Sequence, residues 1–135
     1  MSRLLTLDNG ANIHTTGIYD IFQIITELGP GHFIQTDIDS PQVAIRGVGT
    51  VRFQLNLGEI LEIHRVLIVP RMRVNKLSVS SFEDEGYGMM VRSSHVFLYQ
   101  RDKPLGITIL LGYCKDMLYV LRGNIVRLGA GGWIS

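Results

Sequence analysis

Alternation of apolar and polar residues over positions 43–69 constrains the fold of this chain more than any other feature. From position 51 to position 57 the odd-numbered residues are apolar and the even-numbered residues are polar. This period of two is typical of a strand that buries one face, and the strand is predicted over residues 43–57. Gly58 and Glu59 then mark a turn, and residues 60–69 form the predicted returning strand, which Pro70 stops.

Short segments of strand character continue on both sides of this hairpin. Strands are predicted over residues 4–7, 91–99, 105–111 and 117–121. Residues 100–104 contain Asp102 and Pro104, and they are predicted to form the turn between two of these strands. The regular succession of short strands and turns favours an all-β fold, a small barrel or sandwich.

Two segments have helical features. Apolar residues within 18–28 recur at helical spacing and end at Gly29-Pro30-Gly31, although a strand fits this segment equally well. Residues 77–85 are predicted to form a short helix with Ser78 or Ser80 as its N-cap. The all-β fold is therefore expected to carry one or two short helices.

The composition indicates a single folded domain without a strongly charged surface. Of the 135 residues, 46% are hydrophobic and 19% are charged, which argues against disorder. The chain has 13 basic and 12 acidic side chains and a net charge of +1. This balance indicates neither a nucleic-acid groove nor a surface for anionic membranes. The local basic group of Arg65, Arg71, Arg73 and Lys76 is expected to be a solvated surface.

Cysteine content and hydropathy indicate in which cellular compartment the protein is expected. Cys114 is the single cysteine, so no internal disulfide can form, which fits a reducing compartment. No apolar run approaches the roughly 20 residues of a membrane-spanning helix, and the start of the chain lacks the apolar core of a secretory signal. We therefore expect an intracellular, cytoplasmic protein with no membrane partner.

The candidate catalytic residue is Asp8, which follows the apolar run of residues 4–7 and begins the sequence Asp-Asn-Gly-Ala. A carboxylate that activates water needs a narrow, rigid turn. Gly10 tolerates positive φ and close approach, and Ala11 is small enough to let two such turns pack face to face. Asp-Asn-Gly is also a common signal for an ordinary turn, so the rest of the chain has to support a catalytic interpretation.

Residues 8–17 resemble the Asp-Ser-Gly-Ala-Ser-x-His-x-Thr-Gly stretch of the copia-type retrotransposon proteases, a branch of the retropepsin-like aspartic proteases. The matching residues are Asp8, Gly10, Ala11, His14, Thr16 and Gly17. Further segments resemble this family in the same order, namely residues 47–51, 66–70, 75–80 and 118–121. The resemblance implies a retropepsin-like small closed barrel or sandwich with a flap hairpin over residues 1–121. Residues 122–135 are a glycine-rich C-terminal tail that matches no motif of the family.

Aspartic proteolysis needs two carboxylates that share one proton. The ionised carboxylate takes a proton from water, and the protonated one polarises the scissile carbonyl. The chain contains one Asp-x-Gly-Ala turn, so the second aspartate has to come from a second copy, which predicts a twofold-symmetric homodimer. The resemblance implies the same arrangement. It also implies cleavage of a polypeptide substrate such as a gag-pol polyprotein, with Asp8, Asn9, Gly10 and Ala11 as the catalytic turn.

The resemblance also assigns residues outside the catalytic turn. The flap is expected over residues 32–51, with Asp37, Ile38, Asp39 and Ser40 at its tip as substrate-binding residues. Ser40 stands where the family usually has glycine, and together with Pro41 it should stiffen this lid. Leu77, Ser78 and Val79 match the stretch that lies behind the catalytic turn in the family, so they are expected to support Asp8.

Asn9 departs from the family and leaves an alternative open. In the family a serine or threonine hydroxyl at this position joins a hydrogen-bond network between the two catalytic turns. An amide is longer and planar, and its donor and acceptor are fixed. The alternative is therefore a catalytically silenced, host-adopted domain that acts as a dimeric protein-binding or regulatory module.

No cofactor and no metal are expected. His14, His32, His64 and His95 are scattered, and no two of them are four residues apart. With a single cysteine the chain also lacks a zinc-finger pattern.

Overall fold

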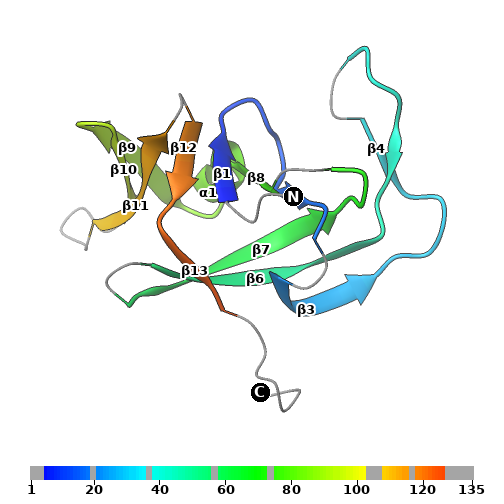
Figure 1. Cartoon of the computed structure of the whole chain (residues 1–135), viewed down its shortest axis with the longest axis horizontal. Helices are drawn as coiled ribbons and strands as arrows, with labels where there is room; N and C mark the ends of the chain where they lie inside the picture. The colour runs from blue at the N-terminus through cyan, green and yellow to red at the C-terminus, as the bar shows by residue number, and fades with distance from the viewer. Residues whose placement is uncertain are drawn as a thin grey trace.

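The computed structural model describes residues 5–18, 21–35, 38–55, 58–72, 75–102, 108–115 and 118–126, and these residues form thirteen strands and one short helix (Figure 1). The strands in the first half of the chain are β1 (Leu5–Asp8), β2 (Thr15–Thr16), β3 (Phe22–Glu27), β4 (Phe33–Ile34), β5 (Val43–Ala44), β6 (Gly47–Leu55) and β7 (Ile60–Ile68). The later elements are β8 (Asn75–Ser78), α1 (Val79–Asp84), β9 (Tyr87–Arg92), β10 (His95–Gln100), β11 (Ile109–Lys115), β12 (Leu118–Leu121) and β13 (Gly123–Ile125).

Most strands belong to one sheet, in the order β13-β6-β7-β2-β8-β1-β12-β11-β10-β9, with β3 paired to β6 beside this path. Two neighbouring pairs are parallel, β1 with β8 and β2 with β7. The predicted all-β class is confirmed. The expected closure into a barrel is not found, because the described strands leave β9 and β13 as the two open ends of the path.

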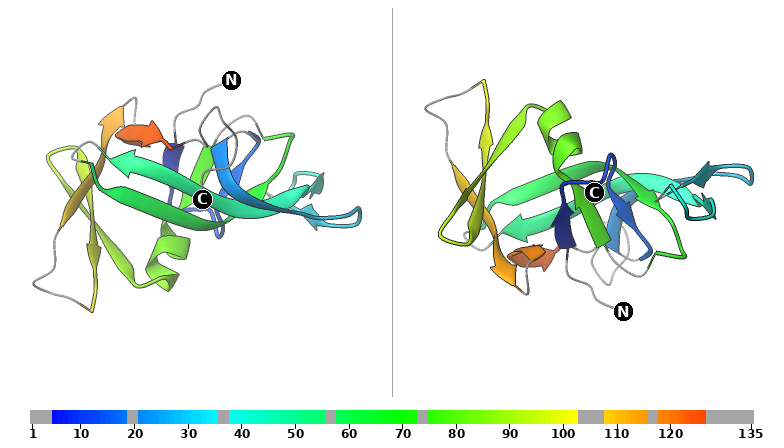
Figure 2. Two further views of the ribbon diagram at one scale, coloured as in Figure 1. Left: turned by 90° about the horizontal axis from the view of Figure 1, so that it is seen from below. Right: turned by 90° about the horizontal axis from the view of Figure 1, so that it is seen from above.

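The hairpin of β6 and β7 forms the long axis of the molecule (Figures 1 and 2). Its turn is closed by the Gly58 amide, which donates to the Leu55 carbonyl at 2.9 Å, and Gly58 itself has a φ of +99°. The alternation predicted from the sequence is confirmed, because Val51, Phe53 and Leu55 are buried in β6. Leu57 lies outside the described residues. The predicted strand from residue 43 is interrupted after Ala44, so β5 and β6 are separate strands.

The hydrophobic core lies between this hairpin and the strands that follow α1. Phe82 of α1 and Leu98 of β10 are almost completely buried there, together with Ile63 and Ile68 of β7. Each fully buried side chain of this size contributes about 1.5–3 kcal/mol relative to its exposed state. The core therefore fixes β8 and α1, which are the elements behind the candidate catalytic turn.

Within the segment 18–28, which fitted a helix or a strand, Phe22–Glu27 forms strand β3. Ile24 pairs opposite Thr50 and Glu27 opposite Gly47, with a bulge between Phe22 and Ile24. Adjacent β-branched residues at positions 24–26 favour an extended backbone. The free edge of β6 supplies the hydrogen bonds that a single strand cannot make itself, so the helical spacing was misleading.

The predicted single strand over residues 91–99 is wrong. β9 and β10 are two strands of a tight hairpin, and Ser93 and Ser94 between them have φ values of 51° and 64°. The sequence prediction missed this turn because neither residue is a glycine, which is the usual residue at positive φ. The glycine-rich segment after residue 121 begins with strand β13, which pairs with β6 at Gly123 and Leu55.

A second, two-stranded sheet of β4 and β5 projects from the rest of the molecule (Figure 2). Phe33 pairs opposite Ala44 and Ile34 opposite Val43, so a hairpin forms within the expected flap region. No helix in the described part of the chain combines the length and apolar character needed to cross a bilayer.

Candidate active site

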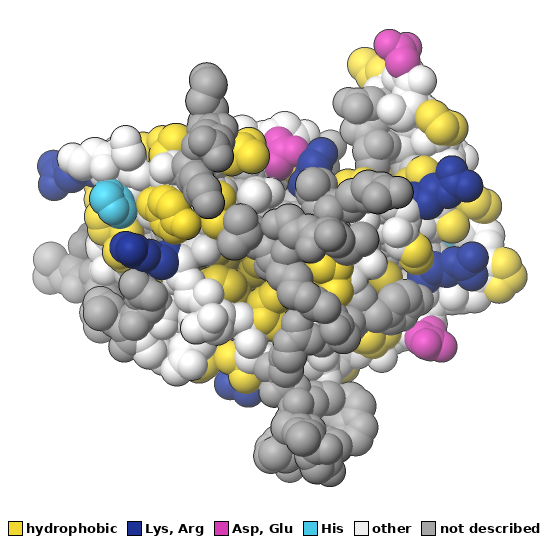
Figure 3. Space-filling model, viewed as in Figure 1, with side chains coloured by type: hydrophobic (Ala, Val, Ile, Leu, Met, Phe, Trp, Pro, Cys, Tyr) yellow, Lys and Arg dark blue, Asp and Glu magenta, His cyan; other side chains and the backbone are white. Residues whose placement is uncertain are grey.

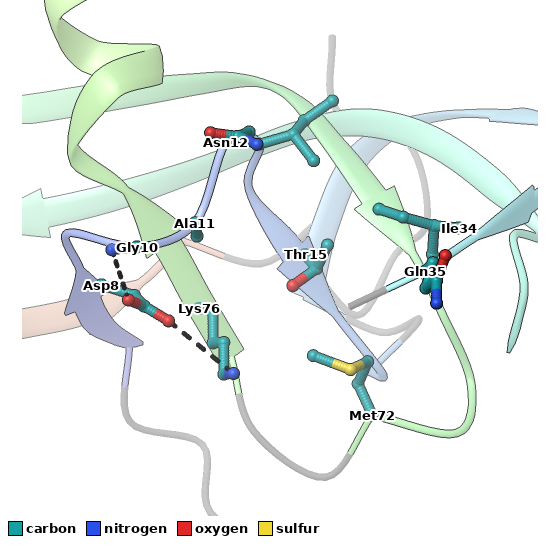
Figure 4. Close-up of a pocket in the computed structure, with 10 residues that line it drawn as sticks. Asp8, Gly10, Ala11, Asn12, Thr15, Ile34, Gln35, Met72 and Lys76 are labelled. Atoms are coloured by element: carbon teal, nitrogen blue, oxygen red, sulfur yellow. Dashed lines mark hydrogen bonds and ion pairs between the residues drawn. The ribbon is translucent and has the colours of Figure 1, made fainter. Parts of the chain in front are cut away.

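A pocket of about 380 Å³ lies between the end of β1 and the base of the β4–β5 hairpin (Figure 4). On the β1 side, the lining residues belong to the end of β1, to the turn after it and to strands β2 and β8. On the other side, they come from the base of the hairpin and from the loop after β7. The described lining residues are Asp8, Gly10, Ala11, Asn12, Ile13, Thr15, Ile34, Gln35, Met72 and Lys76. Figure 3 shows the surface hollowed beside the projecting hairpin, with acidic and basic atoms next to each other in the hollow.

Asp8 is the last residue of β1, and its carboxylate is held from two sides. The Gly10 amide donates to Asp8 Oδ1 at 2.8 Å, and the Lys76 ammonium lies 3.7 Å from Asp8 Oδ2. The Asp8 side chain is 36% exposed, so it is oriented by the turn and still open to solvent. These contacts leave the carboxylate facing the pocket (Figure 4).

The sequence suggested that Gly10 serves the turn through a positive φ, but its φ is not positive. Among the described residues, the glycines with positive φ are Gly31, Gly58, Gly86 and Gly123. A Cβ atom built on Gly10 would lie 3.4 Å from Asp8 Oδ1, which is an ordinary van der Waals contact. Gly10 therefore serves the site through its backbone amide.

The position of Asp8 is fixed by pairing in the middle of the sheet. β1 runs parallel to β8, with Asp8 opposite Ser78 and Leu7 opposite Leu77, and β12 pairs with its other edge. Thr6 and Leu7 therefore have strand neighbours on both edges, which makes β1 hard to displace. Because Asp8 is the last residue of β1, the start of the turn is held in place by the same pairing.

The start of α1 holds the other end of the turn. Ser78 is the N-cap of α1, because its Oγ accepts from the Ser81 amide at 3.1 Å, and the same Oγ donates to the Ala11 carbonyl at 2.7 Å. Ser81 Oγ donates to the Asn12 carbonyl at 3.1 Å. One hydroxyl of Ser78 thus caps the helix and anchors the candidate catalytic loop.

His14 fixes the same loop from inside the core. Its Nδ1 accepts from the Ser78 amide at 2.8 Å, and its ring lies edge-on to Phe82 at 4.8 Å between centroids. Burial, and secondarily the charge of Arg65, lowers the pKa of His14 to about 4. The neutral ring carries its proton on Nε2, because Nδ1 is an acceptor. Nε2 is buried and has no hydrogen-bond partner among the described residues.

Thr16 and Asn75 form a second buried polar contact behind the turn. The Thr16 hydroxyl donates to the side-chain oxygen of Asn75, and it accepts from the Ile18 amide at 3.1 Å. Thr6 Oγ1 donates to the Asn75 carbonyl at 3.1 Å. Thr6 and Thr16, which lie before and after the turn, are therefore attached to Asn75 of β8 by separate side-chain bonds.

Sequence reasoning missed Lys76, which it placed in a solvated basic surface. Lys76 instead lines the pocket and is the partner of Asp8. The available signal was the stretch Asn75-Lys76-Leu77-Ser78, where a lysine interrupts a segment expected to support Asp8. Thr15, Gln35 and Met72 were also missed, because they come together only in the folded chain (Figure 4).

The remaining predicted site residues lie at different distances from the pocket. Asn9 is exposed at the tip of the turn and does not line the pocket, and Leu77 is buried in the core behind β1. Val79 is half-buried in the first turn of α1.

The described residues of the expected flap tip do not line the pocket, whereas residues at the base of the hairpin do. Ile38 is 93% exposed, and Asp39 is exposed beside it in the loop of the β4–β5 hairpin. Ser40 is half-buried there, and Asp37 lies outside the described residues. Ile34 and Gln35, at the base, line the pocket.

The described residues contain no group of three or more histidine, cysteine, aspartate or glutamate side chains that could hold a metal ion. The pocket itself offers a single carboxylate and a single ammonium among its described lining residues.

Comparison with known proteins identifies the family. The model of the Pol polyprotein beta-barrel domain matches residues 5–87, from the first residue of β1 to the first residue of β9. This range covers more than half of the chain and includes every described residue that lines the pocket. No curated protein and no solved structure matches the chain. The chain therefore belongs to the family of Pol polyprotein beta-barrel domains and derives from the Pol protein of a retroelement.

Proposed function

We propose that this domain is a retropepsin-like aspartic endopeptidase of the copia type that acts as a homodimer, with Asp8 of each copy at the reacting bond. The observation that carries the proposal is the placement of Asp8. Its carboxylate lies on a turn anchored by Gly10 and faces a pocket whose opposite wall is the base of a projecting hairpin.

The chemistry follows from two such carboxylates sharing one proton. The ionised carboxylate removes a proton from water as the water oxygen bonds to the carbonyl carbon of the substrate. The protonated carboxyl gives its proton to the carbonyl oxygen. When the tetrahedral intermediate collapses, the C–N bond breaks and the leaving nitrogen takes the proton from the carboxyl that had accepted it from water. One gem-diol hydroxyl gives its proton to the other carboxylate, which restores the shared-proton pair.

The dimer brings the two turns together across a twofold axis. Asn9 is exposed beside Asp8, so it is available to contact the turn of a second copy. An extended polypeptide would lie between the Asp8 turn and the hairpin base. Ile34 and Met72 offer it apolar contacts, and Gln35 offers a side-chain amide for its backbone groups.

The test is cleavage of a diverse peptide library between about pH 4 and 7, with dimer content measured in the same samples. Asp8→Ala should abolish the cleavage that the wild type shows. Asp84→Ala removes an exposed carboxylate in α1 that does not line this pocket, so it serves as the matched control and should retain activity. Cleavage that persists in Asp8→Ala, or its absence from a wild type that is dimeric, would overturn the proposal.

A second candidate function is the silenced, host-adopted module that binds a protein partner. The specific observation in its favour is the ion pair of Asp8 with Lys76, because the ammonium occupies an oxygen that a proton-sharing pair would use. Asn9 in place of a hydroxyl adds to this argument. A dimer that cleaves nothing but forms a complex with a partner, unchanged by Asp8→Ala, is the result that this candidate predicts.

A further inference from the structure

Lys76 is a charged residue inside the pocket that the chemistry of the aspartate pair does not use. It lies on β8 opposite Thr6 of β1 and Thr15 of β2. Its neighbours Asn75 and Leu77 are buried on the other face of the strand, so the alternation of the strand directs Lys76 toward the pocket. Its side chain is 39% exposed and its Nζ lies 3.7 Å from Asp8 Oδ2 (Figure 4).

The charges of the working site do not cancel if the dimer proposed above forms. Two Asp8 carboxylates that share one proton carry a single negative charge, whereas two Lys76 side chains carry two positive charges. The other described residues that line the pocket are uncharged. The proton that enables catalysis therefore leaves one ammonium of the site without a compensating carboxylate.

We propose that Lys76 is a specificity-determining residue that selects substrates with an aspartate or glutamate directly beside the scissile bond. This inference rests on the proposed endopeptidase function. Because the ammonium lies within 4 Å of the carboxylate that activates water, a substrate carboxylate that pairs with it has to belong to a residue flanking the reacting carbonyl. Ile34 and Met72 offer apolar contacts to the rest of the substrate, so Lys76 is the lining residue that can pair with a substrate carboxylate.

The expected preference is moderate because the ammonium remains partly open to water. A half-exposed charge pair contributes less than a buried one. An acidic residue should therefore raise kcat/KM about two- to fivefold over its neutral isostere. Salt should reduce the preference, since screening acts on exposed charges.

The experiment compares four peptides that share one cleavable bond, with Glu or Gln on its amino side and Glu or Gln on its carboxyl side. The enzymes are the wild type, Lys76→Gln, Lys76→Arg and Arg92→Gln. Arg92 is exposed at the end of β9, on the terminal strand of the sheet path, so its substitution removes the same charge away from the pocket. The readout is the Glu/Gln ratio of kcat/KM for each enzyme.

We expect a ratio of about two to five at one of the two positions for the wild type, for Lys76→Arg and for Arg92→Gln. Lys76→Gln should bring the ratio close to one. Equal cleavage of Glu and Gln peptides by the wild type, or an unchanged ratio in Lys76→Gln, would overturn the role of Lys76 and leave the endopeptidase function standing.

Failure of the proposed function gives a different result, which is no cleavage of any of the four peptides by a dimeric wild type. Equilibrium binding of the same peptides then decides the inference. Tighter binding of a Glu peptide that Lys76→Gln removes would support Lys76 as the residue that selects acidic ligands, and equal binding would overturn it. Thermal unfolding of each variant separates loss of selectivity from loss of fold, and Lys76→Arg tests the charge if Lys76→Gln does not fold.

Discussion

The two walls of the pocket are built in contrasting ways. The wall formed by residues 8–18 is tied to β8 and α1 by bonds between residues far apart in the sequence, such as Ser78 to Ala11 and His14 to Ser78. The opposite wall is the β4–β5 hairpin, which pairs only with itself in the described sheets and makes side-chain bonds within its own loop. One wall can therefore hold a reacting group in place, while the other is suited to open and close over a ligand.

The largest difference between the walls should appear at two glycines. A Cβ atom on Gly17 would lie 2.0 Å from the Met72 carbonyl oxygen and 3.3 Å from that of Val69, and neither backbone segment can yield cheaply. Gly17→Ala should therefore lower the free energy of unfolding by about 3 kcal/mol or more. Urea-induced unfolding measures this loss.

Gly29→Ala is the matched control on the hairpin side. A Cβ atom on Gly29 meets nothing within 4 Å, so the change should stay within about 0.5 kcal/mol. Equal effects of the two substitutions would contradict the contrast between the walls.

The anchored wall should also respond to acid through His14. The unfolded chain protonates this histidine below its ordinary pKa of 6.5, whereas the folded protein keeps the ring neutral down to a pKa of about 4. Between these values the unfolded state binds more protons, so stability falls as the pH is lowered. The neutral His14 ring contributes fully to the free energy of unfolding above pH 6.5, and about 3 kcal/mol of that free energy should be lost on approach to pH 4. Unfolding at a series of pH values measures it.

His14→Asn places an acceptor near the Nδ1 position without a group that titrates in this range. The variant should show a shallower pH dependence between pH 4 and 6.5, whatever its overall stability. His32→Gln, at the exposed base of the hairpin, should keep the wild-type dependence. An unchanged slope in His14→Asn would show that other groups cause the acid sensitivity.

Ser78 should give the next largest effect. Ser78→Ala removes the cap of α1 and leaves the Ala11 carbonyl without its 2.7 Å donor, so a loss of about 2 kcal/mol is expected. Ser40→Ala on the hairpin keeps the backbone carbonyl that Gln35 uses and should change stability by less than about 0.5 kcal/mol. Thermal unfolding compares the two variants. A larger loss of stability in Ser40→Ala would contradict the conclusion that residues 8–18 form the more firmly held wall.

The sequence predicted those parts of the fold that depend on local patterns. The β6–β7 hairpin and its turn follow from alternation and Gly58, and the short helix with Ser78 as its N-cap follows from capping chemistry. Segment 22–27 could not be decided locally, because its strand character depends on the free edge of β6. The β9–β10 turn was hidden because Ser93 and Ser94 adopt positive φ without glycine.

Of the candidate site, the sequence predicted only the turn that begins at Asp8. Asp8 and Gly10 stand together in the sequence, and the turn joins them as expected. Lys76 lies 68 positions away and reaches Asp8 because β1 and β8 pair in parallel, a register that no local pattern specifies. The pocket also uses the hairpin base, at Ile34 and Gln35, rather than its tip, because the hairpin projects away from the turn.

The smallest expected effect tests the hairpin wall directly. Gln35 Nε2 donates to the carbonyls of Ile38 and Ser40 at 2.8 and 3.0 Å, and all three groups are near the surface. Gln35→Ala should therefore lower the free energy of unfolding by less than about 1 kcal/mol, because water replaces exposed bonds. Hydrogen exchange of the amides in residues 38–44 should still become faster, since these bonds close the loop. Gln54→Ala on the β6–β7 hairpin removes an exposed glutamine outside this loop and should leave that exchange unchanged. Exchange in Gln35→Ala as slow as in the wild type would mean that the pairing of β4 with β5 alone holds the hairpin, and that the Gln35 side chain does not restrain this wall of the pocket.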